Sequence, residues 1–172
     1  MRYWVLAGMV VIAFLLQSVV SAYLALWGVT PDFLLVLTVT YGLLFGWRVG
    51  LGAGALGGLL TDLTSGRLIG LHVLALSLVG LLAGLVEERV FKDNRLLPPV
   101  AGFIGAIVGQ TVVLLCLVMF GWQVPFAGTF RYSILPAAVY DMFLASLIYG
   151  RIYKYYLYLR PDPRGTIVIR KH

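Results

Sequence analysis

Long apolar runs separated by short polar connections make up most of the chain. None shows the apolar–polar alternation over about ten residues that marks a strand of a membrane β-barrel. The pattern therefore predicts an all-α membrane protein, a bundle of six transmembrane helices with spans at residues 3–27, 32–47, 50–63, 70–86, 97–121 and 134–157. The second and third spans are short, because a spanning helix needs about 17–25 residues. A single re-entrant hairpin over both is the alternative.

Polar and proline residues mark where two of these helices begin. Thr30, Pro31 and Asp32 are predicted to be the N-cap, the first helical residue and an acid in the first turn. Ser133 is predicted to cap the last helix, with Pro136 in its first turn, where a missing N–H costs nothing.

The composition excludes a water-soluble domain and a disordered chain. Of the 172 residues, 61% are hydrophobic and 12% are charged, and the mean hydropathy is +0.97. Soluble domains carry about 25% charged residues, and disordered chains are poor in apolar residues. The net charge of +6 is compatible with nucleic-acid binding, but its distribution indicates a membrane surface and no nucleic acid.

The distribution of Lys and Arg sets the expected orientation. With six spans, eleven basic residues fall on the side of the termini and two, Arg67 and Arg131, fall on the other side. Cytoplasmic loops of membrane proteins carry the excess of Lys and Arg, so both termini are expected in the cytoplasm. The eleven are Arg2, Arg48, Arg89, Lys92, Arg95, Arg151, Lys154, Arg160, Arg164, Arg170 and Lys171.

The two ends of the chain carry further expectations. Val20-Ser21-Ala22 resembles a signal-peptidase site, but the apolar run continues to Trp27, so an uncleaved first span is expected. We expect a transmembrane domain over residues 1–159 and a basic cytoplasmic tail over 160–172. The tail is predicted to bind anionic lipid head groups, with a partner contact through residues 166–169 as the alternative.

Small residues recur four positions apart on three of the predicted helices. Such spacing lets helix backbones approach closely, either within one chain or against a partner helix. The residues are Gly50, Gly54 and Gly58, then Gly80 and Gly84, then Ala101, Gly105 and Gly109. Gly52 to Gly57 also matches a dinucleotide-binding pattern, but the strand and βαβ unit that this motif requires are missing.

Ionisable residues gather in the outer half of the predicted bundle: Asp32, Asp62, His72 and Asp141. An acid in hydrocarbon is costly unless it is paired, neutralised or hydrated, so this grouping predicts an outward polar cavity or a partner contact. For Asp62, the alternative is a local turn in which it accepts hydrogen bonds from Ser65 and Gly66. For His72, facing water at the membrane surface is the alternative to pairing with Asp62.

Motifs for catalysis are incomplete. Tyr140-Asp141 matches one signature of aspartyl intramembrane proteases, but the Gly-x-Gly-Asp signature is missing, because Thr61 and Leu60 precede Asp62. There is no H-E-x-x-H motif and no P-loop. We therefore expect no enzyme, no cofactor and no metal.

Several of these stretches resemble a known family, the rod-shape-determining membrane protein MreD. They are Pro31-Asp32-Phe33-Leu34-Leu35, the run Gly57–Gly66, and Gly70-Leu71-His72. Ile69 stands where the family usually has leucine. Pro136 and Tyr140 resemble the start of its last span, where Asn often stands in place of Asp141. The resemblance covers essentially the whole chain.

The resemblance implies a non-enzymatic inner-membrane scaffold of the bacterial elongation machinery. Such proteins bind MreC and, with it, regulate peptidoglycan synthesis by RodA and its class B penicillin-binding protein, with MreB as an indirect partner. Contacts with membrane lipids are expected, and a homodimer is left open. Pro31, Asp32, Asp62 and His72 are expected to shape the outward cavity or partner surface.

The family also resembles the substrate-binding subunits of energy-coupling-factor vitamin transporters, six-helix proteins with an outward pocket. A small-molecule-binding transporter subunit is therefore the alternative function. Those subunits usually carry an Ala-x-x-x-Ala contact on the first span, and Ala7, Ala13, Ala22 and Ala25 do not give that spacing.

Overall fold

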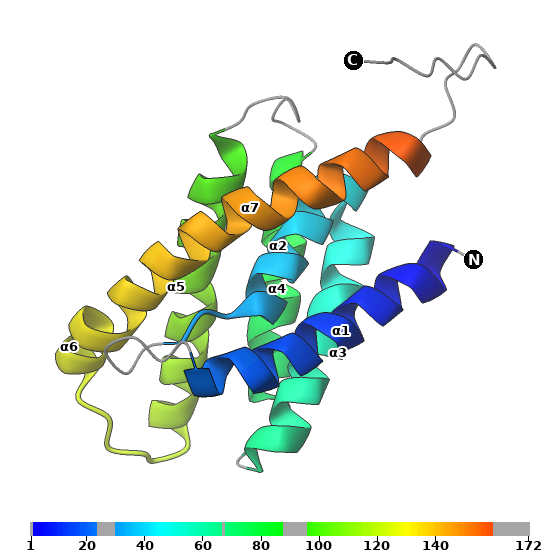
Figure 1. Ribbon diagram of the computed structural model, residues 1–172. Helices are drawn as coiled ribbons and strands as arrows, with labels where there is room; N and C mark the ends of the chain where they lie inside the picture. Colours follow the sequence, from blue (N-terminus) through cyan, green and yellow to red (C-terminus); the bar gives the residue numbers. More distant parts are fainter. Residues whose placement is uncertain (1, 24–29, 67, 88–95, 160–172) are drawn as a thin grey trace.

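The computed structural model describes residues 2–23, 30–66, 68–87 and 96–159, and these residues form helices with no strand among them (Figure 1). The all-helical expectation is confirmed for this part of the chain. There are six longer helices, and a short helix and a π-helical segment lie between the last two of them: α1 (Arg2–Tyr23), α2 (Phe33–Phe45), α3 (Trp47–Ser65), α4 (Leu71–Glu87), α5 (Leu97–Met119), α6 (Phe126–Thr129), the π-helical η1 (Phe130–Ile134) and α7 (Leu135–Leu159).

Two predicted helix starts are wrong. Asp32, not Thr30, is the N-cap of α2, because its carboxyl group reaches the backbone N–H of Leu35 at 3.0 Å. Ser133 caps no helix, because α6, η1 and α7 follow one another without a break from Phe126. The expected third span at 50–63 is longer in the structure and runs from Trp47 to Ser65.

Two segments of the described chain are long and apolar enough to cross a membrane by length and composition: Leu97–Met119 and Phe130–Lys154. The other apolar helices are shorter, and α2, with 13 residues, is the shortest of them. At a rise of about 1.5 Å per residue it reaches about 20 Å, against a hydrocarbon thickness of about 30 Å. The six-span arrangement as a whole stays a prediction.

α2 lies at the centre of the bundle and contacts α1, α3, α4, α5 and α7. Its residues from Leu34 to Leu44 are all buried. Among them is Tyr41, whose hydroxyl donates to the carbonyl of Leu6 on α1 at 3.3 Å. The central helix is therefore the surface on which the other five long helices assemble.

Glycines bring α3 and α4 together. A Cβ atom at Gly54 would overlap the backbone of Leu76, and one at Gly58 would overlap the backbone of His72 and Val73. Gly80 faces the backbone of Gly50 in the same way. The glycines that the sequence pattern predicted on these two helices therefore mediate packing between two helices of this chain.

The other small residues also face inward. Gly84 packs against Trp47 at the start of α3, and Gly105 and Gly109 face side chains of α2 and α4. The sequence pattern missed Gly42, which faces Gly80 and Ala83, and Gly102, which faces Ala145 on α7. Gly102 lies four residues before Ala106 on α5, and Gly42 lies four residues before Gly46 at the end of α2, but neither pair was among the predicted repeats.

Every long helix except α2 turns large apolar side chains outward. Examples are Trp4 on α1, Leu63 on α3, Leu74 on α4, Ile104 on α5 and Phe143 on α7. Water-soluble monomers rarely expose contiguous apolar surface on this scale. The outer surface is therefore suited to lipid.

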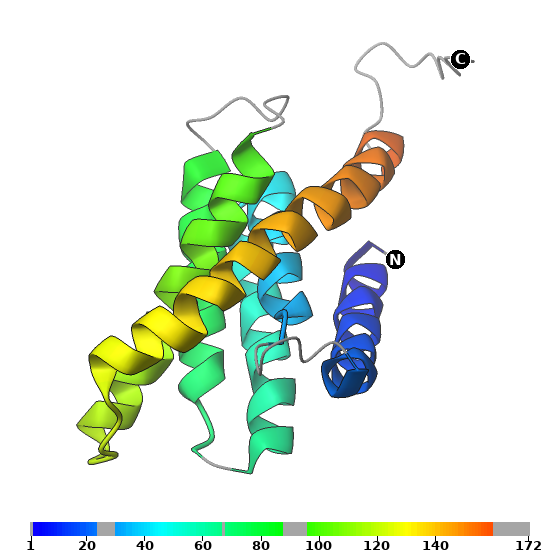
Figure 2. The same ribbon diagram turned by 60° about the vertical axis from the view of Figure 1, so that its left-hand side comes forward.

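Successive long helices alternate in direction, so the start of α1 and the end of α7 lie on the same side of the molecule, at the right in Figure 1. Figure 2 shows α7 running obliquely across the bundle, with α1 separated from it. The α3–α4 turn and the α5–α6 connection lie at the opposite end (Figures 1 and 2). We refer to that end as the outer end, following the orientation expected from the charges.

Candidate functional site

The start of α2 is held by side chains from three helices. The backbone N–H of Asp32 donates to Oδ1 of Asp141 on α7 at 2.8 Å, and that of Leu34 donates to Oε1 of Gln17 on α1 at 3.1 Å. Asp32 itself accepts from the N–H of Leu35. The first N–H groups of a helix have no partner within it, so these three acceptors satisfy groups that would be costly to bury.

Asp141 is fully buried, and only one of its two carboxyl oxygens accepts a hydrogen bond from the described residues. Its Oδ1 takes the hydrogen bond from Asp32, while Oδ2 has no hydrogen-bond partner among the described residues. Tyr140, the neighbouring residue on α7, is half-buried. Residues 109 positions apart in the sequence are thus joined at the start of the central helix.

Asp62 performs the same task for α4. Its two carboxyl oxygens accept the backbone N–H groups of Gly70, His72 and Val73 at 2.8, 3.0 and 3.2 Å. It is 1% exposed, so four hydrogen bonds with the ring of His72 included replace its lost hydration. The alternative in which the Asp62 carboxyl group accepts hydrogen bonds from Ser65 and Gly66 is therefore wrong.

His72 pairs with Asp62, and the alternative in which it only faces water is wrong. The distance from Nδ1 to Oδ1 of Asp62 is 2.7 Å, and the His72 side chain keeps 31% of its surface exposed. Because a carboxylate oxygen only accepts, Nδ1 carries the hydrogen of this bond. The opposite ring nitrogen, Nε2, is left for another contact.

The other residues predicted near this site shape the α3–α4 turn. Gly66 ends α3 in the left-handed conformation, with φ 61°, and its N–H donates to the carbonyl of Asp62 at 3.3 Å. Ser65 is exposed and donates its hydroxyl to the carbonyl of Thr61 at 2.7 Å. Gly70 has φ 107°, which favours glycine, and its N–H faces Asp62.

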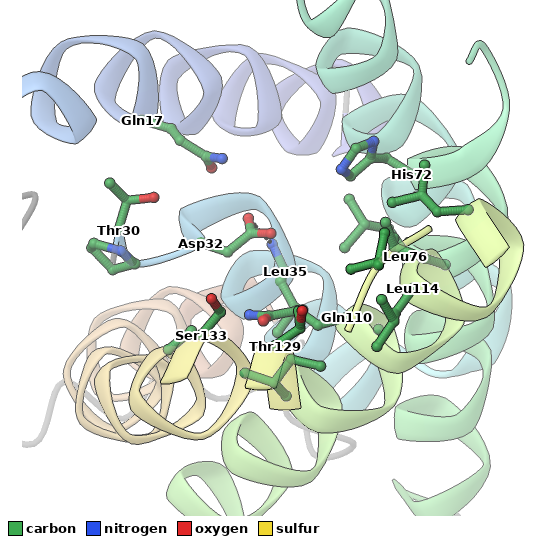
Figure 3. A pocket seen from close by; sticks show the side chains of 18 residues that line it. Gln17, Thr30, Asp32, Leu35, His72, Leu76, Gln110, Leu114, Thr129 and Ser133 are labelled. Carbon is green, nitrogen blue, oxygen red and sulfur yellow. Dashed lines mark hydrogen bonds between the residues drawn. The ribbon is translucent and has the colours of Figure 1, made fainter. Parts of the chain in front are cut away.

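A cavity of about 390 Å³ opens beside these caps, between the outer ends of the helices. Asp32, His72 and Pro31 line it, whereas Asp62 and Asp141 are not among its lining residues. Figure 3 shows Gln17, Asp32 and His72 pointing into the same space from three different elements. The full lining is Gln17, Thr30, Pro31, Asp32, Leu35, His72, Ala75, Leu76, Gly109, Gln110, Val113, Leu114, Leu117, Val124, Thr129, Ser133, Ile134 and Ala137.

Several lining residues were not among the predicted site residues. Thr129 and Ser133 reach the cavity from the end of α6 and from η1, and Gln110 reaches it from α5 (Figure 3). π-Helical segments are rare and occur often at functional sites. A polar residue within an apolar run is the sequence signal that could have identified some of them, since Gln17 and Gln110 both stand in long apolar runs.

The arrangement is suited to binding and offers little for catalysis. The two buried aspartates cap different helices, so they do not form the carboxyl pair of an aspartyl protease. In the described part of the chain, no group of three or more His, Cys, Asp or Glu residues could hold a metal ion. Polar groups facing a largely apolar cavity are typical of sites that orient a ligand.

Comparison with known proteins identifies the family. A family model described as rod shape-determining protein MreD matches residues 1–159. No curated protein and no solved structure matches the chain. These comparisons give no support to the transporter alternative. The match includes every helix described above and the stretches that carry Asp32, Asp62, His72 and Asp141. The chain therefore belongs to the MreD family of rod-shape-determining membrane proteins.

Proposed function

We propose that this protein is a multi-pass scaffold of the bacterial inner membrane that binds MreC and thereby regulates peptidoglycan synthesis during cell elongation. The observation that carries the proposal is the family match over residues 1–159, which includes all the helices. RodA and the class B penicillin-binding protein are engaged directly or through MreC, and MreB is an indirect partner. The protein itself is not an enzyme.

The α3–α4 turn is the partner surface that we propose for MreC. Leu63 and Ile69 flank this turn and are 62% and 72% exposed. The turn between them is fixed from inside by Asp62, which holds Gly70 and His72. A turn that presents two exposed apolar side chains at the outer end has the features of a small binding epitope, since a few residues carry most of the binding energy at an interface.

The test is copurification of MreC with the double variant Leu63→Ser and Ile69→Ser. We expect at least a tenfold loss of MreC recovery and rounded cells, because truncating central contact residues costs more than about 1.4 kcal/mol. The matched control is Leu96→Ser, which removes a 71% exposed leucine at the opposite end of the bundle. Unchanged MreC recovery and normal rod shape in the double variant would discard this surface.

Lipids and a second copy are the remaining partners in the proposal. The outward apolar side chains of α1, α5 and α7 support direct lipid contact. A homodimer stays a prediction, and the mass of the protein–micelle complex tests it independently of MreC.

A further inference from the structure

The cavity at the outer end is large enough for a small organic ligand. Its volume of about 390 Å³ falls within the usual range for ligand sites, about 300–1,000 Å³. The MreC surface proposed above lies on the α3–α4 turn, and its two apolar side chains do not line this cavity. Binding in the cavity would therefore be a property separate from the scaffold function.

The charges around the cavity indicate the sign of the ligand. Asp32 and His72 are the ionisable residues among those that line it, and none of the described lining residues is Lys or Arg. The imidazole of His72 is already paired with Asp62. Apart from His72, the lining offers the Asp32 carboxyl group no basic side chain, an arrangement that disfavours ligands of net negative charge.

A second carboxyl group lies next to the first. Asp141 lies behind Asp32, bonded to its backbone N–H, and its Oδ2 has no partner among the described residues. The start of a helix contributes only about +0.5 of an elementary charge. With even one of the two carboxyl groups ionised, the start of α2 is therefore net negative and attracts a cation.

The neutral side chains indicate that the cation is organic. Hydroxyl and amide groups of Thr30, Gln110, Thr129 and Ser133 also line the cavity, and Leu35, Leu76 and Leu114 supply apolar wall (Figure 3). The oxygen of Gln17 is engaged by Leu34, which leaves its NH₂ group as a donor. Hydroxyl-bearing ligands fit such a wall better than a bare metal ion, for which the described residues offer no group of three or more His, Cys, Asp or Glu.

We propose that the outward cavity binds a small protonated amine that carries hydroxyl or ester oxygens, with its ammonium group at Asp32. The source is either a free amino alcohol or the amine head group of a membrane lipid. The ammonium donates to the Asp32 carboxylate, while the oxygens accept from Gln17, Gln110 and the hydroxyl groups at the mouth. The apolar wall contacts the carbon atoms of the ligand.

The test uses the full-length protein in nanodiscs of phosphatidylglycerol. One arm titrates ethanolamine, with ethylene glycol as the matched compound that lacks the amine. The other arm replaces part of the lipid by phosphatidylethanolamine and counts retained lipids by native mass spectrometry. The unfolding midpoint is followed in both arms, because a ligand that binds the folded state raises it. Ethanolamine has about four non-hydrogen atoms, so its Kd is expected in the millimolar range.

Three variants isolate the cavity. Asp32→Asn keeps an acceptor for the Leu35 N–H and removes the charge, and we expect at least a tenfold weaker affinity because a charge-assisted hydrogen bond is lost. Glu87→Gln makes the same chemical change at the end of α4 opposite His72 and is expected to bind as the wild type does. Ser133→Phe places a large side chain in the cavity and is expected to abolish binding. This variant tests the cavity independently of whether Asp32→Asn folds.

Each outcome decides the proposal. Binding in both arms would show that a free amine is sufficient for binding. Binding of phosphatidylethanolamine alone would show that the ligand is the lipid head group. Absence of binding in both arms would overturn the proposal. Equal affinity of the wild type, Asp32→Asn and Ser133→Phe would overturn it as well, and so would a preference for phosphatidylglycerol.

Discussion

At the scale of single residues, the two buried aspartates differ in how many donors depend on them. Asp62 accepts four hydrogen bonds through both oxygens, whereas Asp141 accepts one through Oδ1. From the sequence, both were expected to stand in the outer half of the bundle, near the polar residues of the α2 start and the α3–α4 turn. Their partners were not predictable, since Asp141 bonds a residue 109 positions away.

Asparagine is expected to distinguish the two positions. Asp62→Asn places an NH₂ group against donors whichever way the amide is turned, so two of them lose their acceptor and the folded state is destabilised by about 2–5 kcal/mol. In Asp141→Asn the amide oxygen still accepts from Asp32, and the cost is expected to stay below about 1 kcal/mol. Thermal or denaturant unfolding in micelles measures both.

Asp141→Leu is the control for this comparison. It keeps the branched shape of the side chain but removes the acceptor, so the partly buried Asp32 N–H is left unpaired at a cost of about 1–3 kcal/mol. Equal destabilisation by asparagine at both positions would contradict the hydrogen-bond pattern described here.

At the scale of elements, the close packing of α3 against α4 depends on glycines, which have no side chain. Small residues at spacing four predicted a close approach but not which helices meet. Gly42 and Gly102 were not predicted, although each faces a neighbouring helix. The N-cap of α2 was misplaced by two residues, since Thr30 and Asp32 are both good caps and only the path of the chain selects one.

Two alanine substitutions on α3 test this close packing. Gly54→Ala places a methyl group against the backbone of Leu76, which must shift, and we expect a loss of about 1–3 kcal/mol. Gly52→Ala, on the same helix, has nothing within 4 Å of its new Cβ and is expected to be neutral or up to about 1 kcal/mol stabilising. Unfolding in micelles compares them, and equal stability would show that α3 and α4 do not approach as described.

At the scale of the whole molecule, the arrangement of helices around α2 could not be predicted from the sequence. Apolar runs reveal helices, but in a membrane protein the lipid-facing and buried faces are both apolar, so hydropathy does not identify the central helix. The feature that distinguishes α2 is its start, where Asp32, Asp141 and Gln17 converge. Charge counts predicted that this end faces outward.

Cysteine accessibility tests that orientation and the outward cavity most directly. In a Cys116→Ala background, Ser133→Cys places a thiol at the cavity and Leu96→Cys places one at the opposite end of the bundle. In spheroplasts, a membrane-impermeant maleimide is predicted to label Ser133→Cys directly, and Leu96→Cys only after the membrane is permeabilised. Labelling of Leu96→Cys from outside, with Ser133→Cys protected until permeabilisation, would contradict the account.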